Sequence, residues 1–270
     1  MHAEFGGIVP EEASRDHVVN LNRVFENTMQ AAQLAPKDLD AIAVTRGPGL
    51  VGPLLCGLEF AKGLALGLGK PLIGVHHLEG HISAVFLEER TPSSPFLVLL
   101  VSGGHTRIVR VEAEGGPYEK LGNTRDDAAG EAFDKSAKLL GLGYPGGRII
   151  DEWAQKGDAK RFAFPTLMAG KTNLDFSFSG LKTHVRRAVQ ERETPFSGTD
   201  LADFCAGFQR TVVRNLLKKS FAAVRQTGIP RLVLGGGVAA NSELRATALE
   251  HGKRERVEVF LPSKAFAQTT

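Results

Sequence analysis

The chain has 270 residues, of which 42% are hydrophobic and 23% are charged, a balance typical of a globular protein with one large domain or two modest ones. The net charge of +3 and the pI of about 8.9 permit a nucleic-acid partner without indicating one. No uncharged apolar run is long enough to span a bilayer, and the N-terminus does not resemble a signal peptide. We therefore expect a cytoplasmic protein with no membrane partner, whose two cysteines, Cys56 and Cys205, stay reduced.

The first part of the chain predicts an alternation of helices and strands. Its apolar periodicity predicts a helix at 11–33, a strand at 41–45, a glycine-rich turn at 46–53, a helix at 54–68, a strand at 70–75 and a helix at 77–90. The segment TPSSP at 91–95 then interrupts the pattern and reads as a linker. We expect a first domain at residues 1–95 and a second at 96–270.

The second part repeats the alternation. It predicts a strand at 96–101, a tight turn at 102–106, a strand at 107–113, helices at 126–142, 144–155, 176–192 and 199–228, a strand, a triple-glycine turn and a helix within 231–252, and a last strand at 256–262. Strands that alternate with helices in both parts predict an α/β fold with two sheets.

Three glycine-rich turns follow apolar strands: RGPGLVGP, VSGGHT and LGGGVAAN. Glycine lets the backbone approach a ligand, and free amides at a turn or a helix start bind phosphate. Tight turns and close helix packing also require glycine, so a single such turn is weak evidence for a ligand. Asn241, at the end of the third turn, either caps the following helix or bonds a sugar or base.

Asp134 lies on the predicted helix GEAFDK, near the PGG turn at 145–147. A carboxylate in this position can accept hydrogen bonds from a ribose, but a solvated helical charge explains it as well.

His77 and His81 in HHLEGH are one helical turn apart, on the same face of a helix, where two imidazoles can share a metal ion. Satisfied, partly buried histidines are the alternative. The H-E-x-x-H zinc proteases need Glu directly after the first His, where this chain has Leu78, and Glu79 points away from that face. The spacing therefore disfavours a zinc protease, and no third histidine stands at a useful distance.

The motifs HLEGH, VSGGHT, DDAAGEAFDK, GYPGG, FSFSGLK and GGGVAAN, in this order, resemble the TsaD/Gcp family of tRNA threonylcarbamoyltransferases from about His2 to Pro262. The resemblance implies the fold of actin, Hsp70 and the sugar kinases (ASKHA), with two RNase H-like halves and a nucleotide between them. A sugar kinase or Hsp70-like ATPase shares this fold but leaves HLEGH unexplained.

The resemblance also implies a reaction. The threonylcarbamoyl group moves from threonylcarbamoyl-AMP to N6 of the adenosine beside the anticodon in tRNAs that read ANN codons. The expected partners are tRNA, a small paralogous TsaB-like subunit and a TsaE-like P-loop ATPase.

Carried over by position, His77 and His81 match two metal ligands, for Fe²⁺ or else Zn²⁺. The residues that match contacts to the adenylate or carbamoyl end of the substrate are Leu100, Val101, Ser102, Gly103 and Gly104. The residues that match contacts to the nucleoside and ribose are Asp134, Gly147 and Asn241. The basic residues that we expect either to meet tRNA phosphates or to form a solvated helix face are Lys182, Arg186, Arg187 and Arg192.

The chain departs from the family pattern at both ends. It begins just after the place of an ETSCDET-like hairpin, and it ends with LPSKAFAQTT where the family continues with a CTDNAAMIA-like segment. The aspartate of that segment is the third metal ligand, so we expect a weak two-histidine site and doubtful activity of this chain. The alternative function is a catalytically impaired fragment or paralogue that binds nucleotide or partner subunits.

Overall fold

A computed structural model describes residues 9–168 and 173–263, and the chain packs as two compact units, residues 1–80 and 81–270. The sequence places the boundary later, between residues 95 and 96. The helix α4 (His77–Ser83) contains the point of division, and the 3-10 helix η2 (Ala84–Leu87) follows it. Val85 of η2 is buried and Phe86 packs edge-on against Phe96 of the second unit, with ring centroids 5.9 Å apart. These apolar contacts are why η2 belongs to the second unit.

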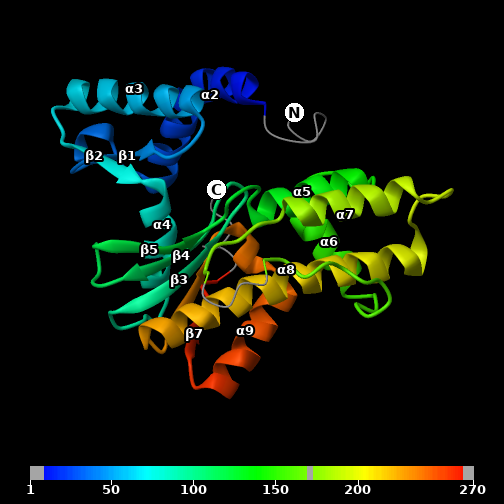
Figure 1. Ribbon diagram of the computed structural model, residues 1–270. Helices are drawn as coiled ribbons and strands as arrows, with labels where there is room; N and C mark the ends of the chain where they lie inside the picture. Colours follow the sequence, from blue (N-terminus) through cyan, green and yellow to red (C-terminus); the bar gives the residue numbers. More distant parts are fainter. Residues whose placement is uncertain (1–8, 169–172, 264–270) are drawn as a thin grey trace. The chain divides into compact units, whose positions relative to one another are not determined.

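In its described residues, the first unit combines α-helices with a two-stranded parallel sheet (Figure 1). Its elements are α2 (Pro10–Ala32), η1 (Pro36–Asp38), β1 (Ile42–Gly47), α3 (Val51–Leu68) and β2 (Leu72–His76). The strands pair from Ile42 opposite Leu72 to Thr45 opposite Val75, and the register then shifts before Gly47. Gly52 brings α3 close to α2, because a side chain there would meet the Ser14 hydroxyl.

Nearly all the exposed large hydrophobic side chains of the described residues belong to the first unit. Leu66 and Leu55 of α3 are 86% and 53% exposed, and Ile73 of β2 is 52% exposed. Among the described residues, α3 alone is long and apolar enough to cross a membrane by length and composition. It nevertheless carries an ion pair between Glu59 and Lys62.

The second unit contains a five-stranded sheet in the order β5-β4-β3-β6-β7. Its strands are β3 (Phe96–Val101), β4 (Thr106–Val111), β5 (Tyr118–Asn123), β6 (Arg231–Gly235) and β7 (Glu258–Phe260). The strands β3, β4 and β5 are antiparallel neighbours, and β6 joins β3 in parallel. Every residue of β3 is buried, because the central strand is covered on both faces.

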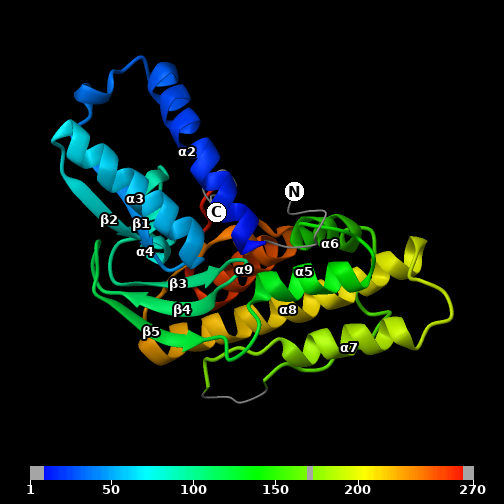
Figure 2. The same cartoon turned by 90° about the horizontal axis from the view of Figure 1, so that it is seen from above.

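The helices of the second unit pack against the sheet face that carries Leu97, Leu99 and Val101. They are α5 (Ala129–Leu139), α6 (Gly146–Ala154), α7 (Ser179–Gln190), α8 (Gly198–Thr227), the 3-10 helix η3 (Gly237–Ala240) and α9 (Ser242–Glu255). The long helix α8 runs across this layer (Figure 2). Aromatic side chains fill the space between helices, as where Phe208 of α8 meets Phe133 of α5 edge-on, with centroids 5.3 Å apart.

The sequence predictions are confirmed for the main helices and for six of the strands, and they miss β5. The helix expected at 126–142 begins only at Ala129, because Asp126 and Asp127 turn away to bond elsewhere. The helix expected at 77–90 ends at Ser83 and continues only as η2.

Candidate active site

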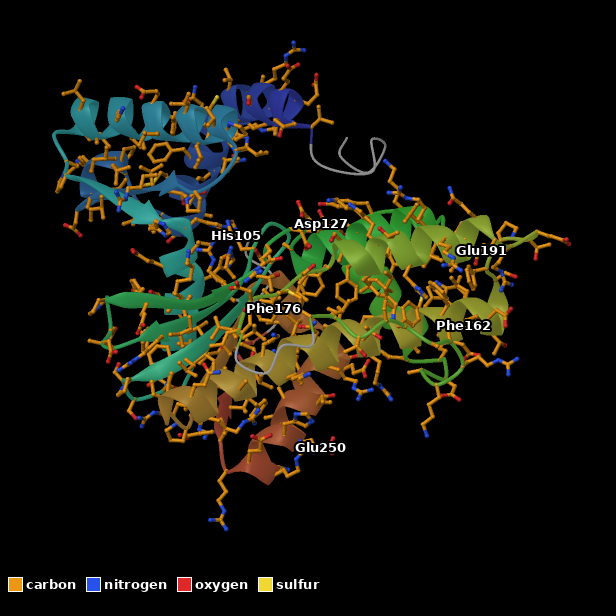
Figure 3. The ribbon with its side chains drawn as sticks, viewed as in Figure 1. His105, Asp127, Phe162, Phe176, Glu191 and Glu250 are labelled. Atoms are coloured by element: carbon orange, nitrogen blue, oxygen red, sulfur yellow. The ribbon has the colours of Figure 1, made fainter. Side chains whose placement is uncertain are left out.

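The turn between β3 and β4 exposes its backbone. Leu100 and Val101 end the buried strand, Ser102 is 3% exposed, and its N–H donates to the carbonyl of His105 at 2.8 Å. A side-chain carbon added at Gly103 or Gly104 would meet nothing within 4 Å. Packing therefore does not require glycine at these two positions, and their backbone is open to a ligand. Figure 3 labels His105 on this turn.

Two further glycines hold this turn in place. A Cβ at Gly130, in the first turn of α5, would lie 2.6 Å from the carbonyl oxygen of Ser102. A Cβ at Gly236, after β6, would lie 2.4 Å from the carbonyl oxygen of Val101. The hydroxyl of Thr106 also accepts the N–H of Ala129 at 2.8 Å. These contacts fix the turn between the start of α5 and the end of β6.

Asp134, one helical turn after Gly130, caps the start of α6. Its carboxylate accepts the N–H of Gly146 at 2.8 Å and also that of Gly147. Burial raises the pKa of Asp134, and the nearby Glu131 adds to this, while the two amide bonds work against it. Within the described part of the chain, no lysine or arginine forms an ion pair with this carboxylate. A half-buried carboxylate without a cation is costly, which suggests that it serves a ligand.

The two glycines that begin α6 differ. A Cβ at Gly146 would lie 2.6 Å from Ala137 and 2.7 Å from the Phe133 carbonyl, so packing requires glycine there. A Cβ at Gly147 would lie 3.9 Å from its nearest neighbour, an ordinary contact. Gly147 is therefore the position at which a ligand can approach the start of the helix.

Asn241 caps α9, as one of its two alternative interpretations expects. Its Oδ1 accepts the N–H of Leu244 at 2.9 Å, and its Nδ2 donates to Oε1 of Gln209 at 2.7 Å. Among the described residues, the second hydrogen on Nδ2 has no partner, so the cap leaves one donor for a ligand.

Asp151 and Gln209 also lie at this site, although no sequence pattern singles them out. Nε2 of Gln209 donates to Oδ1 of Asp151 at 3.0 Å, and Asp151 also accepts from the Ser242 hydroxyl at 2.6 Å and from its N–H at 3.1 Å. The only available signal was the placement of Asp151 one helical turn after Gly147. Nothing in the sequence pairs it with Gln209, which lies far along the chain.

Together these contacts close a ring around one end of the sheet. The β3–β4 turn contacts the start of α5, and Asp134 of α5 caps α6. Asp151 of α6 accepts a hydrogen bond from the start of α9, and Gly236, which precedes η3, lies against the β3–β4 turn. The predicted residues Leu100 to Gly104, Asp134, Gly147 and Asn241 all lie on this ring. The structure therefore brings them together, although they come from four separate segments.

His77 and His81 lie on α4 with the spacing that the sequence predicts. His81 is 5% exposed, and burial, together with the nearby His76, lowers the pKa of His77. A lowered pKa favours the neutral imidazole, which is the metal-binding form. The described residues contain no group of three His, Cys, Asp or Glu side chains that could hold a metal. The chain end, on which the expected absence of a third ligand rests, lies in residues 264–270, outside the described part.

The basic face of α7 is largely paired with acids. Nζ of Lys182 lies 3.1 Å from Asp127, Nε of Arg187 lies 2.6 Å from Glu191, and Arg192 binds Asp200 at 3.0 Å. Of the four predicted phosphate contacts, Arg186 is the one with no ion pair among the described residues. The solvated-face alternative therefore accounts for most of this charge.

The acidic pair before α5 explains how α7 is held. Asp126 accepts the N–H groups of Phe178 and Ser179 at 2.7 and 3.3 Å, together with the hydroxyl of Ser179 at 2.8 Å. Burial raises the pKa of Asp126, but these bonds outweigh it, and the net pKa is lowered. Figure 3 labels the neighbouring Asp127 at the entrance to α5.

An open groove of about 500 Å³ lies between α8, α9 and residues 164–167. Arg214, Lys218 and His251 are among its lining residues, and none of the predicted site residues is. It is separate from the ring.

Comparison with known proteins identifies the family. The family model TsaD, described as tRNA N6-adenosine threonylcarbamoyltransferase, matches residues 1–270. The chain belongs to the TsaD family. A tRNA N6-adenosine threonylcarbamoyltransferase of Anaeromyxobacter sp. (strain Fw109-5) is 53% identical over 264 residues, which cover 97% of this chain and 79% of that protein. The enzyme of that name from Chromobacterium violaceum is 50% identical over 268 residues, which cover 98% of this chain and 78% of that protein.

The fold of this TsaD-family chain is also similar to that of HypF. The crystal structure of full-length HypF in the phosphate- and nucleotide-bound form superposes with a TM-score of 0.63 at 15% identity, over 90% of this chain and 39% of HypF. At this identity the similarity concerns the fold alone. The resemblance to the TsaD family and the expected ASKHA-type α/β fold are confirmed, and the role of each site residue stays a prediction.

Because packing does not require glycine at position 103, we expect Gly103→Ala to lower ligand affinity without lowering stability. The added methyl group would enter the open space where the backbone faces a ligand. Gly130→Ala is the matched change with the opposite result. We expect it to lower the free energy of unfolding by about 1–3 kcal/mol, because its methyl group would overlap the backbone of the same turn from the side of α5. Thermal unfolding and calorimetric titration with AMP distinguish the two, and equal loss of stability in both variants would contradict this account.

Proposed function

We propose that this TsaD-family chain transfers the threonylcarbamoyl group from threonylcarbamoyl-AMP to N6 of the adenosine beside the anticodon in tRNAs that read ANN codons. The observation that carries the proposal is the ring of contacts around the open backbone of Gly103, Gly104 and Gly147. The family match over residues 1–270 supplies the reaction. We expect the reaction to take place in the cytoplasm with its tRNA substrate.

The residues of the ring suit an adenylate. In the reaction, N6 of adenosine bonds to the carbamoyl carbon, the bond from that carbon to the phosphate oxygen breaks, the amine loses a proton, and AMP leaves. The exposed amides of the β3–β4 turn and of the α6 start offer donors to the phosphate of AMP, whose negative charge increases as the bond breaks. The Asp134 carboxylate offers an acceptor for ribose hydroxyls, and Asn241 offers one donor.

We propose one Fe²⁺ or Zn²⁺ ion as the cofactor, held in part by His77 and His81. The donor set fits such an ion, because both imidazoles lie on α4 one turn apart. Burial, together with His76, lowers the pKa of His77, which favours the neutral imidazole that binds metals. When bound, the ion would supply a Lewis acid for the carbamoyl carbonyl or the phosphate. The remaining ligands would come from residues or groups beyond the described part of the chain.

If this assignment is right, His77→Ala and His81→Ala will each lose the bound metal. His76→Ala is the matched control, because His76 is adjacent but belongs to β2. Elemental analysis of the purified full chain should find metal in wild type and His76→Ala and little in the other two. Equal metal content in all four proteins would contradict the assignment.

We propose tRNA, a TsaB-like paralogous subunit and a TsaE-like ATPase as partners. The exposed apolar side chains of α3 and β2 favour a protein partner for the first unit, since Leu66 is 86% exposed and Ile73 is 52% exposed. For tRNA, Arg186 is the member of the α7 face that is free of ion pairs among the described residues.

The test of the proposed function is a transfer assay. The full chain, the partner subunits, ATP-derived threonylcarbamoyl-AMP and an ANN-reading tRNA are combined, and the modified adenosine is measured by mass spectrometry of digested tRNA. Formation of the modified nucleoside, dependent on this chain, is the expected result. Nucleotide binding without transfer would instead support the alternative, an impaired nucleotide- or partner-binding protein, which the match over the whole chain does not favour.

A further inference from the structure

We infer that Gln209 of α8 is a positioning residue that orients the amide of Asn241 toward the adenylate. Gln209 is 2% exposed and lies between the start of α9 and the middle of α6. This inference rests on the proposed function, because it treats Asn241 as a contact to the nucleotide.

The direction of the hydrogen bonds carries the argument. Asp151 is a carboxylate and can only accept, so Gln209 must turn its Nε2 toward it, at 3.0 Å. The Oε1 of Gln209 then faces Asn241, whose Nδ2 donates to it at 2.7 Å. At the other end the N–H of Leu244 can only donate, and it bonds Oδ1 of Asn241 at 2.9 Å.

The chain of hydrogen bonds from Asp151 through Gln209 and Asn241 to Leu244 forms a relay whose two ends are fixed. Each of the two side-chain amides between them therefore has one permitted orientation. Flipping either amide would place two acceptors or two donors against each other in a buried site, which is costly. Without Gln209, the N-cap bond alone would hold the Asn241 amide, at one of its two polar atoms. Gln209 anchors the other atom and thus reinforces the orientation in which Asn241 presents a donor, and not an acceptor, to a bound ligand.

Asp151 is itself held by Ser242, through the hydroxyl at 2.6 Å and the N–H at 3.1 Å. The relay therefore spans α6, α8 and α9 and sets the position of Asn241 together with its orientation. The charged neighbours of Gln209 and Ser242 in the sequence, Arg210 and Glu243, pair with each other at 2.7 Å. On α6, Arg148 pairs with Glu152, the neighbour of Asp151, at 2.8 Å.

The test compares two buried amides of α8. Gln209→Met removes the relay at similar volume, and Asn215→Leu is the matched control, because Asn215 is 6% exposed and bonds the Leu167 carbonyl away from the ring. We expect Gln209→Met to weaken AMP binding by about 5- to 30-fold, the effect of one or two buried hydrogen bonds, and the control to leave it unchanged. In transfer assays Gln209→Met should raise the KM for threonylcarbamoyl-AMP with little change in kcat, since Asn241 would hold the adenylate equally in the ground state and the transition state.

Gln209→Glu adds a readout that a purely structural role would not change. Its carboxyl group would face Asp151, and the two would share a proton at low pH. The protonated glutamic acid can donate to Asp151 as Gln209 does, so AMP affinity should recover as the pH falls, whereas wild type should show no such recovery.

The two possible failures differ. If wild type does not bind AMP, the proposed nucleotide site fails and the inference fails with it. If wild type binds AMP but Gln209→Met binds it as tightly as Asn215→Leu does, or Gln209→Glu shows the wild-type pH dependence, the inference alone is overturned.

Discussion

Asp134→Asn will make the protein more stable and a weaker binder of its nucleotide. The asparagine oxygen can still accept the amides of Gly146 and Gly147, while the half-buried charge that burial and Glu131 disfavour is removed. A ribose hydroxyl would, however, lose the charged acceptor that we propose for it, so AMP affinity should fall by about 10- to 100-fold. Thermal unfolding and calorimetric titration of the two proteins measure both changes.

The pH dependence of this stability difference has a definite sign. Because the pKa of Asp134 is raised in the folded protein, its contribution to stability is fully present below the unfolded pKa and is lost as pH rises through the folded pKa. The advantage of Asp134→Asn should therefore appear on going from acidic to neutral pH. A gain that is largest at low pH would contradict the assignment.

Asp127→Asn is the matched control. Burial raises the pKa of Asp127, but Lys135 and Lys182 outweigh this with bonds and charge, so its net pKa is lowered. The contribution of the Asp127 carboxylate to stability is therefore present above its pKa in the unfolded chain and is lost as the pH falls through its pKa in the folded protein. We expect Asp127→Asn to lower stability at neutral pH and to leave AMP affinity unchanged.

Of the substitutions proposed here, Gly236→Ala will lower the stability of the protein most. Its φ is +87°, and the added methyl group would lie 2.4 Å from the Val101 carbonyl oxygen, so backbone strain and overlap add. We expect a loss of about 3 kcal/mol or more in urea unfolding, together with loss of AMP binding, because the β3–β4 turn must move.

Gly228→Ala separates the two causes. Gly228 ends α8 with φ +70°, and an added Cβ there meets nothing within 4 Å. The variant should therefore incur only the strain of a left-handed residue, which lowers the free energy of unfolding by about 1 kcal/mol. If the two alanine variants unfold at the same urea concentration, the close approach of Gly236 to the turn does not hold the site.

The sequence predicts the parts of this fold that are strongly apolar or periodic. The run FLVLLV of β3 and the long pattern of α8 were both identified, because burial on a central strand and along a core helix selects apolar residues. The strand β5, YEKLGN, was not, because it is an edge strand with polar side chains and no alternation.

The site shows the same limit. Glycine turns are visible in a sequence, but which glycines packing requires is not, and Gly146 and Gly147 look alike until their neighbours are known. The relay from Asp151 through Gln209 to Asn241 joins three segments that no local pattern connects. Contacts between distant segments arise from tertiary packing, which periodicity does not encode.

The most direct measurement is a crystal structure of the full chain with AMP. We expect the phosphate to lie against the amides of the β3–β4 turn and of the α6 start, with the ribose on Asp134 and the amide Nδ2 of Asn241 donating to the nucleoside. AMP bound elsewhere, for example in the groove beside Arg214 and Lys218, with the ring empty, would contradict it.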